Sequence, residues 1–132
     1  MSRPLVRNAA SPRQVGHAAR KAKERRTREL VDLRAVLDTE PGRRTIWRFL
    51  KFCGVNETVL RENPITMAEA AGRQNVGHYL MAEVAAADEE AIFTMMREAR
   101  FLDARDARET DAVQTGDTQE KEADGDSSSE TT

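Results

Sequence analysis

Almost all of the large apolar side chains of this chain lie between residues 30 and 102, and this concentration limits the chain to one small core. The chain has 132 residues, of which 39% are hydrophobic and 33% are charged. A stretch of about 70 residues lies near the lower size limit at which one hydrophobic core is sufficient by itself. We therefore expect one helical domain over residues 11–104, and a homo-oligomer or another partner would stabilise it.

Charge is distributed unevenly along the chain. Residues 1–28 contain nine Arg or Lys and one acid, whereas residues 103–132 contain three basic and ten acidic residues. The net charge of −2 therefore conceals a basic beginning and an acidic end. The acidic end has almost no apolar residue to offset the entropy of ordering. We predict a flexible arm over residues 1–10 and an acidic disordered tail over residues 105–132.

The first predicted helix begins at Ser11 and Pro12 and runs to about Leu37. Serine is favoured as an N-cap, and proline is favoured at the first helical position. The first half of this helix has no wide apolar stripe, so tertiary contacts are expected to anchor it only weakly. The residues expected to face the core are Leu30, Val31, Leu33, Val36 and Leu37.

A second helix is predicted from Pro41 to Gly54, because proline suits a first turn and glycine suits a left-handed C-cap. Its predicted core face repeats at i, i+3, i+4 and i+7, with Ile46, Phe49, Leu50 and Cys53. A loop of about ten residues is expected to follow, from Val55 to Pro64.

A third helix is predicted from Met67 to about Ala87, because Thr66 and Glu69 have the spacing of a capping box. The acids at 88–90 suit a new helix N-terminus, so we favour a fourth helix after them. A continuous rod is the alternative, since no Gly or Pro interrupts residues 80–102. The expected fold is all-α, a small bundle of three to four helices with a long basic N-terminal helix and disordered termini.

The sequence contains no pattern that predicts catalysis. His17 and His78 are far apart and have no acidic or cysteine residue at i+4, so no metal site is expected. Cys53, the single cysteine, is expected in the core rather than as a nucleophile, and His78 is expected to be partly buried. We expect no enzyme, no catalytic residue and no cofactor. No apolar run approaches the roughly 20 residues that a membrane span requires.

Six basic side chains of the first helix form a candidate surface for nucleic-acid phosphates or for an acidic partner. A solvated helix face is the simpler explanation, and acidic protein surfaces or the chain's own acidic tail would attract the same charges. The six residues are Arg20, Lys21, Lys23, Arg25, Arg26 and Arg28.

Three aromatic residues of the second helix form a candidate subunit interface. Trp47, Phe49 and Phe52 do not share one face of a helix, so some aromatic surface is expected outside a minimal core. Exposed Trp and Phe commonly anchor protein interfaces. The alternative is a core helix that neighbouring helices surround.

Two Gly-Arg segments carry the most specific pattern in the chain. The first runs from Pro41-Gly42-Arg43-Arg44 to Cys53-Gly54-Val55, and the second is Gly72-Arg73-Gln74-Asn75-Val76-Gly77 with Tyr79-Leu80 after it. Together they resemble the small phage proteins typified by a Bordetella podophage, the Bbp-type phage domain, over about residues 33–100. The resemblance implies roles in helix capping, close helix packing and polar links between helices for Arg43, Arg44, Gly54, Gly72, Arg73, Asn75 and Gly77.

The resemblance also implies a structural role in a virion rather than an enzymatic one. We expect an internal or ejected virion protein, associated with the portal–tail channel and DNA delivery, that is present in the host cytoplasm during assembly. Its expected partners are portal, tail or internal core proteins. The alternatives are a head-to-tail connector or tail ring component, and a DNA-binding packaging or regulatory factor that uses the basic helix.

Overall fold

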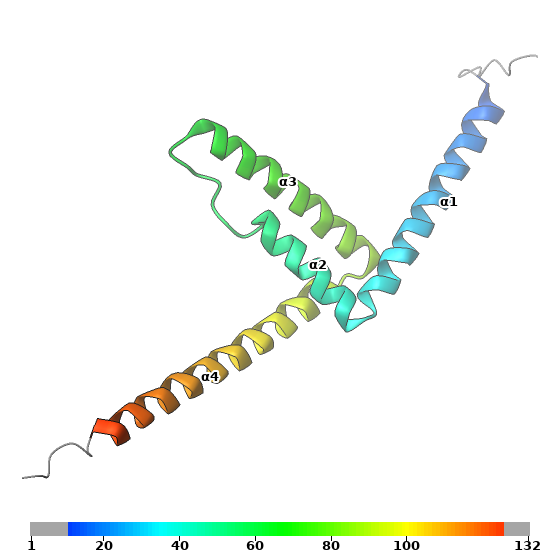
Figure 1. The fold of residues 1–132 in the computed structure, drawn as a ribbon. Coiled ribbons are helices and arrows are strands. Elements are labelled where there is room, and N and C mark those ends of the chain that lie inside the picture. The colour runs from blue at the N-terminus through cyan, green and yellow to red at the C-terminus, as the bar shows by residue number, and fades with distance from the viewer. Residues whose placement is uncertain (1–10, 126–132) are drawn as a thin grey trace, which may run out of the picture. The chain divides into compact units, whose positions relative to one another are not determined.

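The computed structural model describes residues 11–125, with side chains described to residue 116. These residues form four helices: α1 (Pro12–Leu37), α2 (Glu40–Cys53), α3 (Pro64–Ala87) and α4 (Ala91–Gly125) (Figure 1). No strand occurs between residues 11 and 125, so the prediction of an all-α fold is confirmed. The predicted arm at residues 1–10 and the last seven residues of the predicted tail lie outside the described residues.

The turn between α1 and α2 is held by one side chain. The Thr39 hydroxyl accepts a hydrogen bond from the Gly42 amide at 3.1 Å and donates one to the Val36 carbonyl at 3.0 Å. A Cβ at Gly42 would lie 2.7 Å from Thr39 Oγ1 and closer still to the Val36 carbonyl oxygen. Glycine is therefore the residue that lets α2 begin so soon after α1.

Helix α3 begins three residues earlier than the predicted start at Met67. Asn63 is the N-cap, and its Oδ1 accepts a hydrogen bond from the Ile65 amide at 2.8 Å. The Thr66 hydroxyl instead donates to the Asn63 carbonyl at 2.9 Å. Asparagine is a good cap, and Pro64 has a φ suited to the first turn, so this pair starts the helix before the predicted capping box.

Helices α3 and α4 are separate, as the sequence favoured. Asp88 is extended, with φ −153° and ψ 108°, and its Oδ1 accepts a hydrogen bond from the Glu90 amide at 3.0 Å. The chain divides into two units after Ile92, and each unit is described by itself below.

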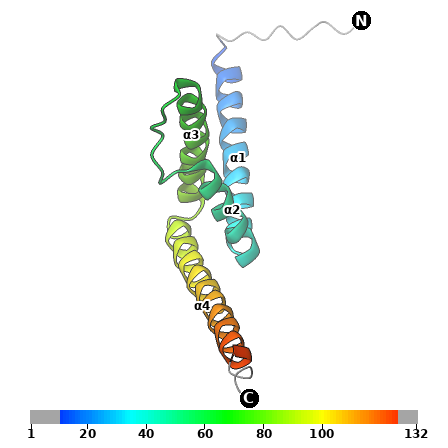
Figure 2. The same cartoon turned by 60° about the vertical axis from the view of Figure 1, so that its left-hand side comes forward.

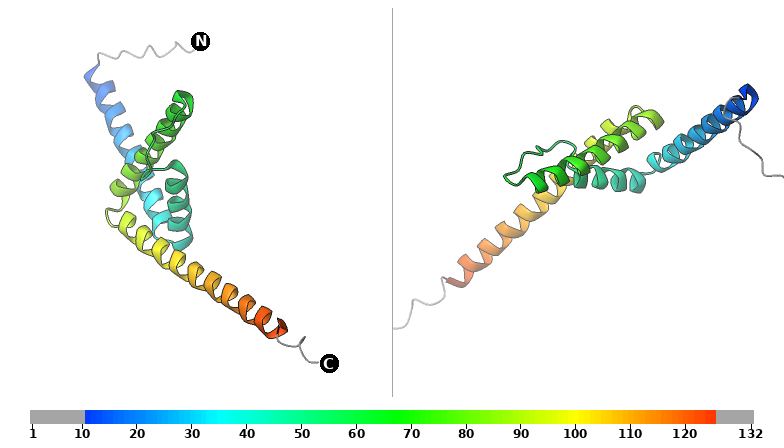
Figure 3. Two further views of the ribbon diagram at one scale, coloured as in Figure 1. Left: turned by 90° about the vertical axis from the view of Figure 1, so that its left-hand side faces the viewer. Right: turned by 90° about the horizontal axis from the view of Figure 1, so that it is seen from above.

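In the first unit, α2 and α3 lie side by side and run in opposite directions (Figures 1 and 3). Helix α1 packs against both of them (Figure 2). Towards its N-terminus α1 diverges from α3, and residues 12–25 are all exposed (Figure 1). Few apolar side chains of the unit are buried: Leu37, Leu50, Cys53, Val84, Ala87 and Ala91.

The structure confirms part of the predicted core and corrects the rest. Val31, Val36 and Phe49 are exposed, Val31 by 61% of its surface. Successive helical residues point about 100° apart, so Val31 lies well away from Leu30, and α1 packs along the stripe that ends at Leu37. Leu30, Leu33 and Ile46 are half-buried.

The second unit is the greater part of α4, from Phe93 onward. It remains helical to Gly125. The prediction of a disordered tail from residue 105 is therefore wrong up to Gly125. Its Ala, Arg, Glu and Gln residues favour a helix, and the Arg105–Glu109 pair at 3.8 Å has the stabilising i,i+4 spacing. A low apolar content excludes a packed core but permits a solvated helix.

Candidate functional site

Gly77 sets the separation of α2 and α3. It is buried, and a Cβ there would lie 2.6 Å from Cys53 Cβ and even closer to Val55 Cγ1. Real carbon atoms do not approach so closely without displacement. Gly77 therefore allows the end of α2 to contact the backbone of α3, which agrees with the close helix packing that the resemblance implied.

Gln74 fixes the loop that joins these two helices. Its Nε2 donates to the Gly54 carbonyl at 2.9 Å and to the Glu57 carbonyl at 2.8 Å. The Gly54 carbonyl belongs to the residue that ends α2, with φ +66°, and so the left-handed cap predicted there is confirmed. One side chain of α3 thus satisfies two carbonyl groups of a loop about 20 residues away.

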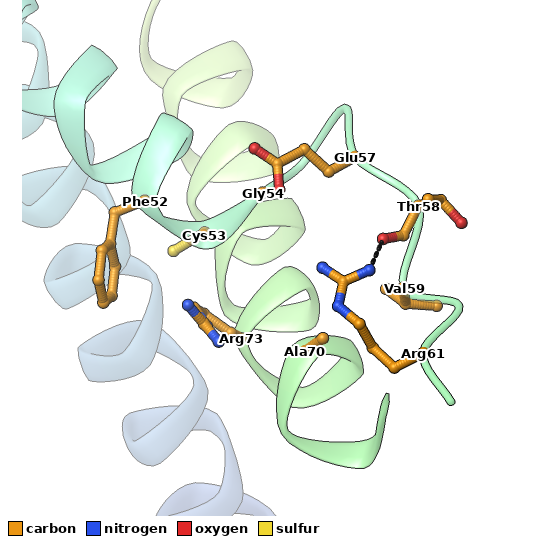
Figure 4. A pocket seen from close by; sticks show the side chains of 9 residues that line it. All are labelled: Phe52, Cys53, Gly54, Glu57, Thr58, Val59, Arg61, Ala70 and Arg73. Carbon is orange, nitrogen blue, oxygen red and sulfur yellow. Dashed lines mark hydrogen bonds between the residues drawn. The ribbon is translucent and has the colours of Figure 1, made fainter. Parts of the chain in front are cut away.

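Arg73 lies one residue earlier on α3 and contacts Phe52 of α2. The carbon at the centre of its guanidinium is 5.4 Å from the centre of the Phe52 ring, a cation–π distance. The two side chains border a hollow of about 40 Å³ between the end of α2, the following loop and α3 (Figure 4). Arg61 enters this hollow from the loop, and Ala70 lies at its base.

The first Gly-Arg segment acts at the opposite end of α2. Arg43 Nη1 donates to the Leu37 carbonyl at 3.0 Å, which links α2 to the last turn of α1. Arg44 pairs with Glu40 at 3.2 Å on the exposed surface, and such pairs add little stability.

Two signature residues differ from what the resemblance implied. A Cβ at Gly72 would have nothing within 4 Å, so this glycine does not take part in the close helix packing that the resemblance implied. Asn75 is exposed on α3, and the polar link to the loop is made by its neighbour Gln74. The motif spacing could not identify Gln74, because its hydrogen-bond acceptors are backbone carbonyls of a loop without periodicity.

Residues 33–97 match the sequence profile of Bbp19-like phage proteins. We call residues 33–97 the Bbp19-like segment. The match indicates a bacteriophage protein. No curated protein and no solved structure matches the chain significantly. The Bbp19-like segment contains the whole α2–loop–α3 arrangement, whereas the six basic candidates of α1 all precede it.

Arg26 differs from the other five basic candidates because it pairs with Glu83 of α3. Its Nη2 donates to Glu83 Oε1 at 2.9 Å and its Nη1 donates to Oε2, which joins α1 to the Bbp19-like α3. The hydrogen bond from Arg26 holds the pKa of Glu83 below its ordinary value, and the same bond raises the pKa of Arg26. Arg26 is therefore a structural residue of the first unit, a role that sequence spacing did not indicate.

The five remaining cations are exposed. Arg28 lies two residues after Arg26 and so points to nearly the opposite face of α1, away from the contact with α3. Lys21 shares this outer face because it precedes Arg28 by seven residues, or about two turns. We call the exposed set the α1 cationic surface: Arg20, Lys21, Lys23, Arg25 and Arg28.

The three aromatic candidates do not form one patch. Phe49 and Phe52 are exposed by 54% and 69% of their surfaces. Trp47 is half-buried and borders a different hollow, together with Lys51 and Val55. The candidate subunit interface is therefore reduced to the phenylalanine pair.

The remaining candidates agree in part with the sequence analysis. Cys53 is buried, as predicted, but His78 is exposed rather than partly buried. Among the residues that the structure describes, no group of three or more His, Cys, Asp and Glu is placed to hold a metal ion. Within the same residues, no helix has the length and apolar character needed to cross a membrane.

Proposed function

We propose that this phage protein is a non-enzymatic, internal virion protein that contacts packaged DNA through the α1 cationic surface and leaves with the DNA through the portal–tail channel. One observation carries the proposal. Five exposed cations lie within nine residues of one helix, and the only acid among these nine residues is Glu24. Such a density of exposed positive charge suits a phosphate backbone.

The position of these charges supports DNA contact. The Arg26–Glu83 ion pair anchors the inner face of α1 to α3, so residues on the outer face remain accessible. A partner as large as a DNA duplex would then meet this face without displacing α2 or α3.

The small core supports passage through a channel. Among its described residues, the first unit has only six buried apolar side chains, three of which are Ala or Cys. A unit with so little buried surface unfolds at a low free-energy cost. Partial unfolding would let its helices pass through a tail channel in single file.

The location is tested by cryo-electron microscopy and quantitative mass spectrometry of intact particles beside emptied particles. We expect the protein in intact particles and its loss on DNA release. Its retention with ring symmetry would contradict ejection, and its absence from both kinds of particle would favour a packaging or regulatory factor of the host cytoplasm.

The DNA contact is tested by the salt dependence of duplex binding. Replacing Lys21, Arg25 and Arg28 with Gln should make the slope of log affinity against log salt shallower by about 2.7, since each phosphate contact contributes about 0.9. A matched control replaces Arg100, Arg105 and Arg108 of α4, which removes the same charge from another surface. Equal slopes for the two triple variants would contradict a contact through α1.

A second candidate is a head-to-tail connector or tail ring component. The observation that favours it is the exposure of Phe49 and Phe52, because exposed aromatic pairs commonly anchor subunit contacts. Two results together would support this candidate. The protein would be present in the particle at the copy number of the portal ring, and changing both Phe49 and Phe52 to Ser would prevent its incorporation. Unchanged incorporation of the double variant would exclude an interface through the phenylalanine pair.

A further inference from the structure

We propose that the hollow between the loop at residues 54–63 and α3 binds a carboxylate side chain of an acidic partner protein. The carboxylate would lie between the guanidinium groups of Arg61 and Arg73, with Phe52 on the other side of Arg73 (Figure 4). The site lies within the Bbp19-like segment and does not depend on the DNA contact proposed for α1.

Arg61 is held in place by the loop itself. Its Nη1 donates to the Thr58 carbonyl at 2.8 Å and to the Leu60 carbonyl at 2.9 Å. Both acceptors are neutral backbone atoms, so the positive charge of Arg61 is not neutralised by them. The Nη2 and Nε groups keep donors for a further acceptor.

Arg73 is positioned by its cation–π contact with Phe52. Its guanidinium carbon lies 5.4 Å from the centre of the Phe52 ring, and this cation–π contact does not use up its N–H donors. Within the described part of the chain, no side-chain carboxylate pairs with Arg73. Two guanidinium groups that border one hollow repel each other, and a carboxylate between them would remove this repulsion and accept charge-assisted hydrogen bonds.

The loop geometry reduces the cost of binding. Gln74 ties the carbonyl groups of Gly54 and Glu57 to α3, so the loop that carries Arg61 is ordered before any ligand arrives. A site that is ordered in advance loses less conformational entropy on binding.

The surrounding charges favour a protein carboxylate over a nucleic acid. Glu57 lines the hollow, and Glu62 and Glu69 are exposed nearby in sequence. DNA carries one charge per roughly 1.7 Å of its axis, so a duplex here would also meet these acids. One carboxylate side chain between the two arginines would meet two positive charges and only one negative charge, that of Glu57, whereas a duplex would also place phosphates beside Glu62 and Glu69.

The test is an NMR titration of the isotope-labelled full chain with N-acetyl-glutamate N-methylamide, monitored at the arginine Nε–H signals. Saturable shifts are expected at Arg61 and Arg73, with no response to the matching glutamine compound. Arg73→Gln and Arg61→Gln should each weaken binding by about tenfold or more, the factor for one charged hydrogen bond. Arg48→Gln, which removes an exposed charge elsewhere on α2, should leave it unchanged.

Three results would overturn the proposal. One is an equal response to the glutamate and glutamine compounds, and another is equal affinity in the Arg73→Gln and Arg48→Gln variants. The third is displacement of the glutamate compound by a short DNA duplex in the variant with Lys21, Arg25 and Arg28 replaced by Gln. This displacement would assign the hollow to nucleic acid. If Arg73→Gln loses its folded spectrum, Arg61→Gln provides the same test. None of these results depends on where the protein lies in the particle.

Discussion

Gly77→Ala tests directly whether this signature glycine sets the α2–α3 separation. The added methyl group would lie 2.6 Å from Cys53 Cβ, whereas carbon atoms in contact are about 3.5–4.0 Å apart. Cys53 Cβ is bonded to the backbone of α2 and cannot rotate away. The two helices must therefore move apart by roughly 1 Å.

The expected magnitude is the difference between two effects. Overpacking a close contact costs about 1–3 kcal/mol, and a contact with backbone-attached atoms belongs in the upper half of this range. Alanine gains about 1 kcal/mol over glycine through helix propensity. The net expectation is a loss of about 1–2 kcal/mol in the free energy of unfolding, or a decrease of about 0.5–1 M in the urea midpoint.

Gly72→Ala is the matched control because it lies on the same helix and has open space around the new methyl group. It should stabilise the chain by about 0.5–1 kcal/mol through helix propensity alone. Trp47, the only tryptophan, lies on α2 and reports unfolding of this unit by its fluorescence in urea. The reasoning is refuted if the two variants shift the midpoint in the same direction by similar amounts.

Two further predictions concern the polar links of α3. The lowered pKa of Glu83 means that its ion pair with Arg26 stabilises the fold above the pKa of the unfolded state, about 4.3, and that this stability is lost as pH falls through the lower folded value. The urea midpoint should therefore fall more steeply between about pH 6 and pH 3 in the wild type than in Glu83→Gln, and parallel profiles would contradict the pairing. Gln74→Ala should cost about 1 kcal/mol and speed amide hydrogen exchange in the loop at residues 54–63, since it removes both hydrogen bonds to that loop. Unchanged exchange there would show that another contact holds the loop.

Helix ends were predicted correctly where the sequence signal was local. Pro12, Gly54 and the acids at 88–90 each act through their own backbone or the adjacent turn, and each lies at a helix boundary in the structure. The start of α3 was wrong by one turn because two local signals competed, and the Asn63–Pro64 pair prevailed over Thr66.

The candidate sites were predicted less well because helical periodicity does not reveal which neighbour covers a face. Phe49 has the spacing of a core residue but is exposed, since α3 packs on the side of α2 that carries Leu50 and Cys53. Arg26 was grouped with five other cations, and only the crossing of α1 over α3 pairs it with Glu83. Gln74 was unremarkable in sequence until the loop placed two carbonyl groups beside it.

The sequence by itself therefore determined the all-helical class, the region of the small core, the opposite charges of the two ends and the family signature. These properties depend on composition, local caps and spacing, and they arise from residues that are close together in the sequence. Only the tertiary structure decided that Gly77 is tight and Gly72 open, that Arg26 is structural, and that Arg61 and Arg73 border one hollow. Each of these depends on the distance between segments that are remote in sequence, and helix packing fixes that distance.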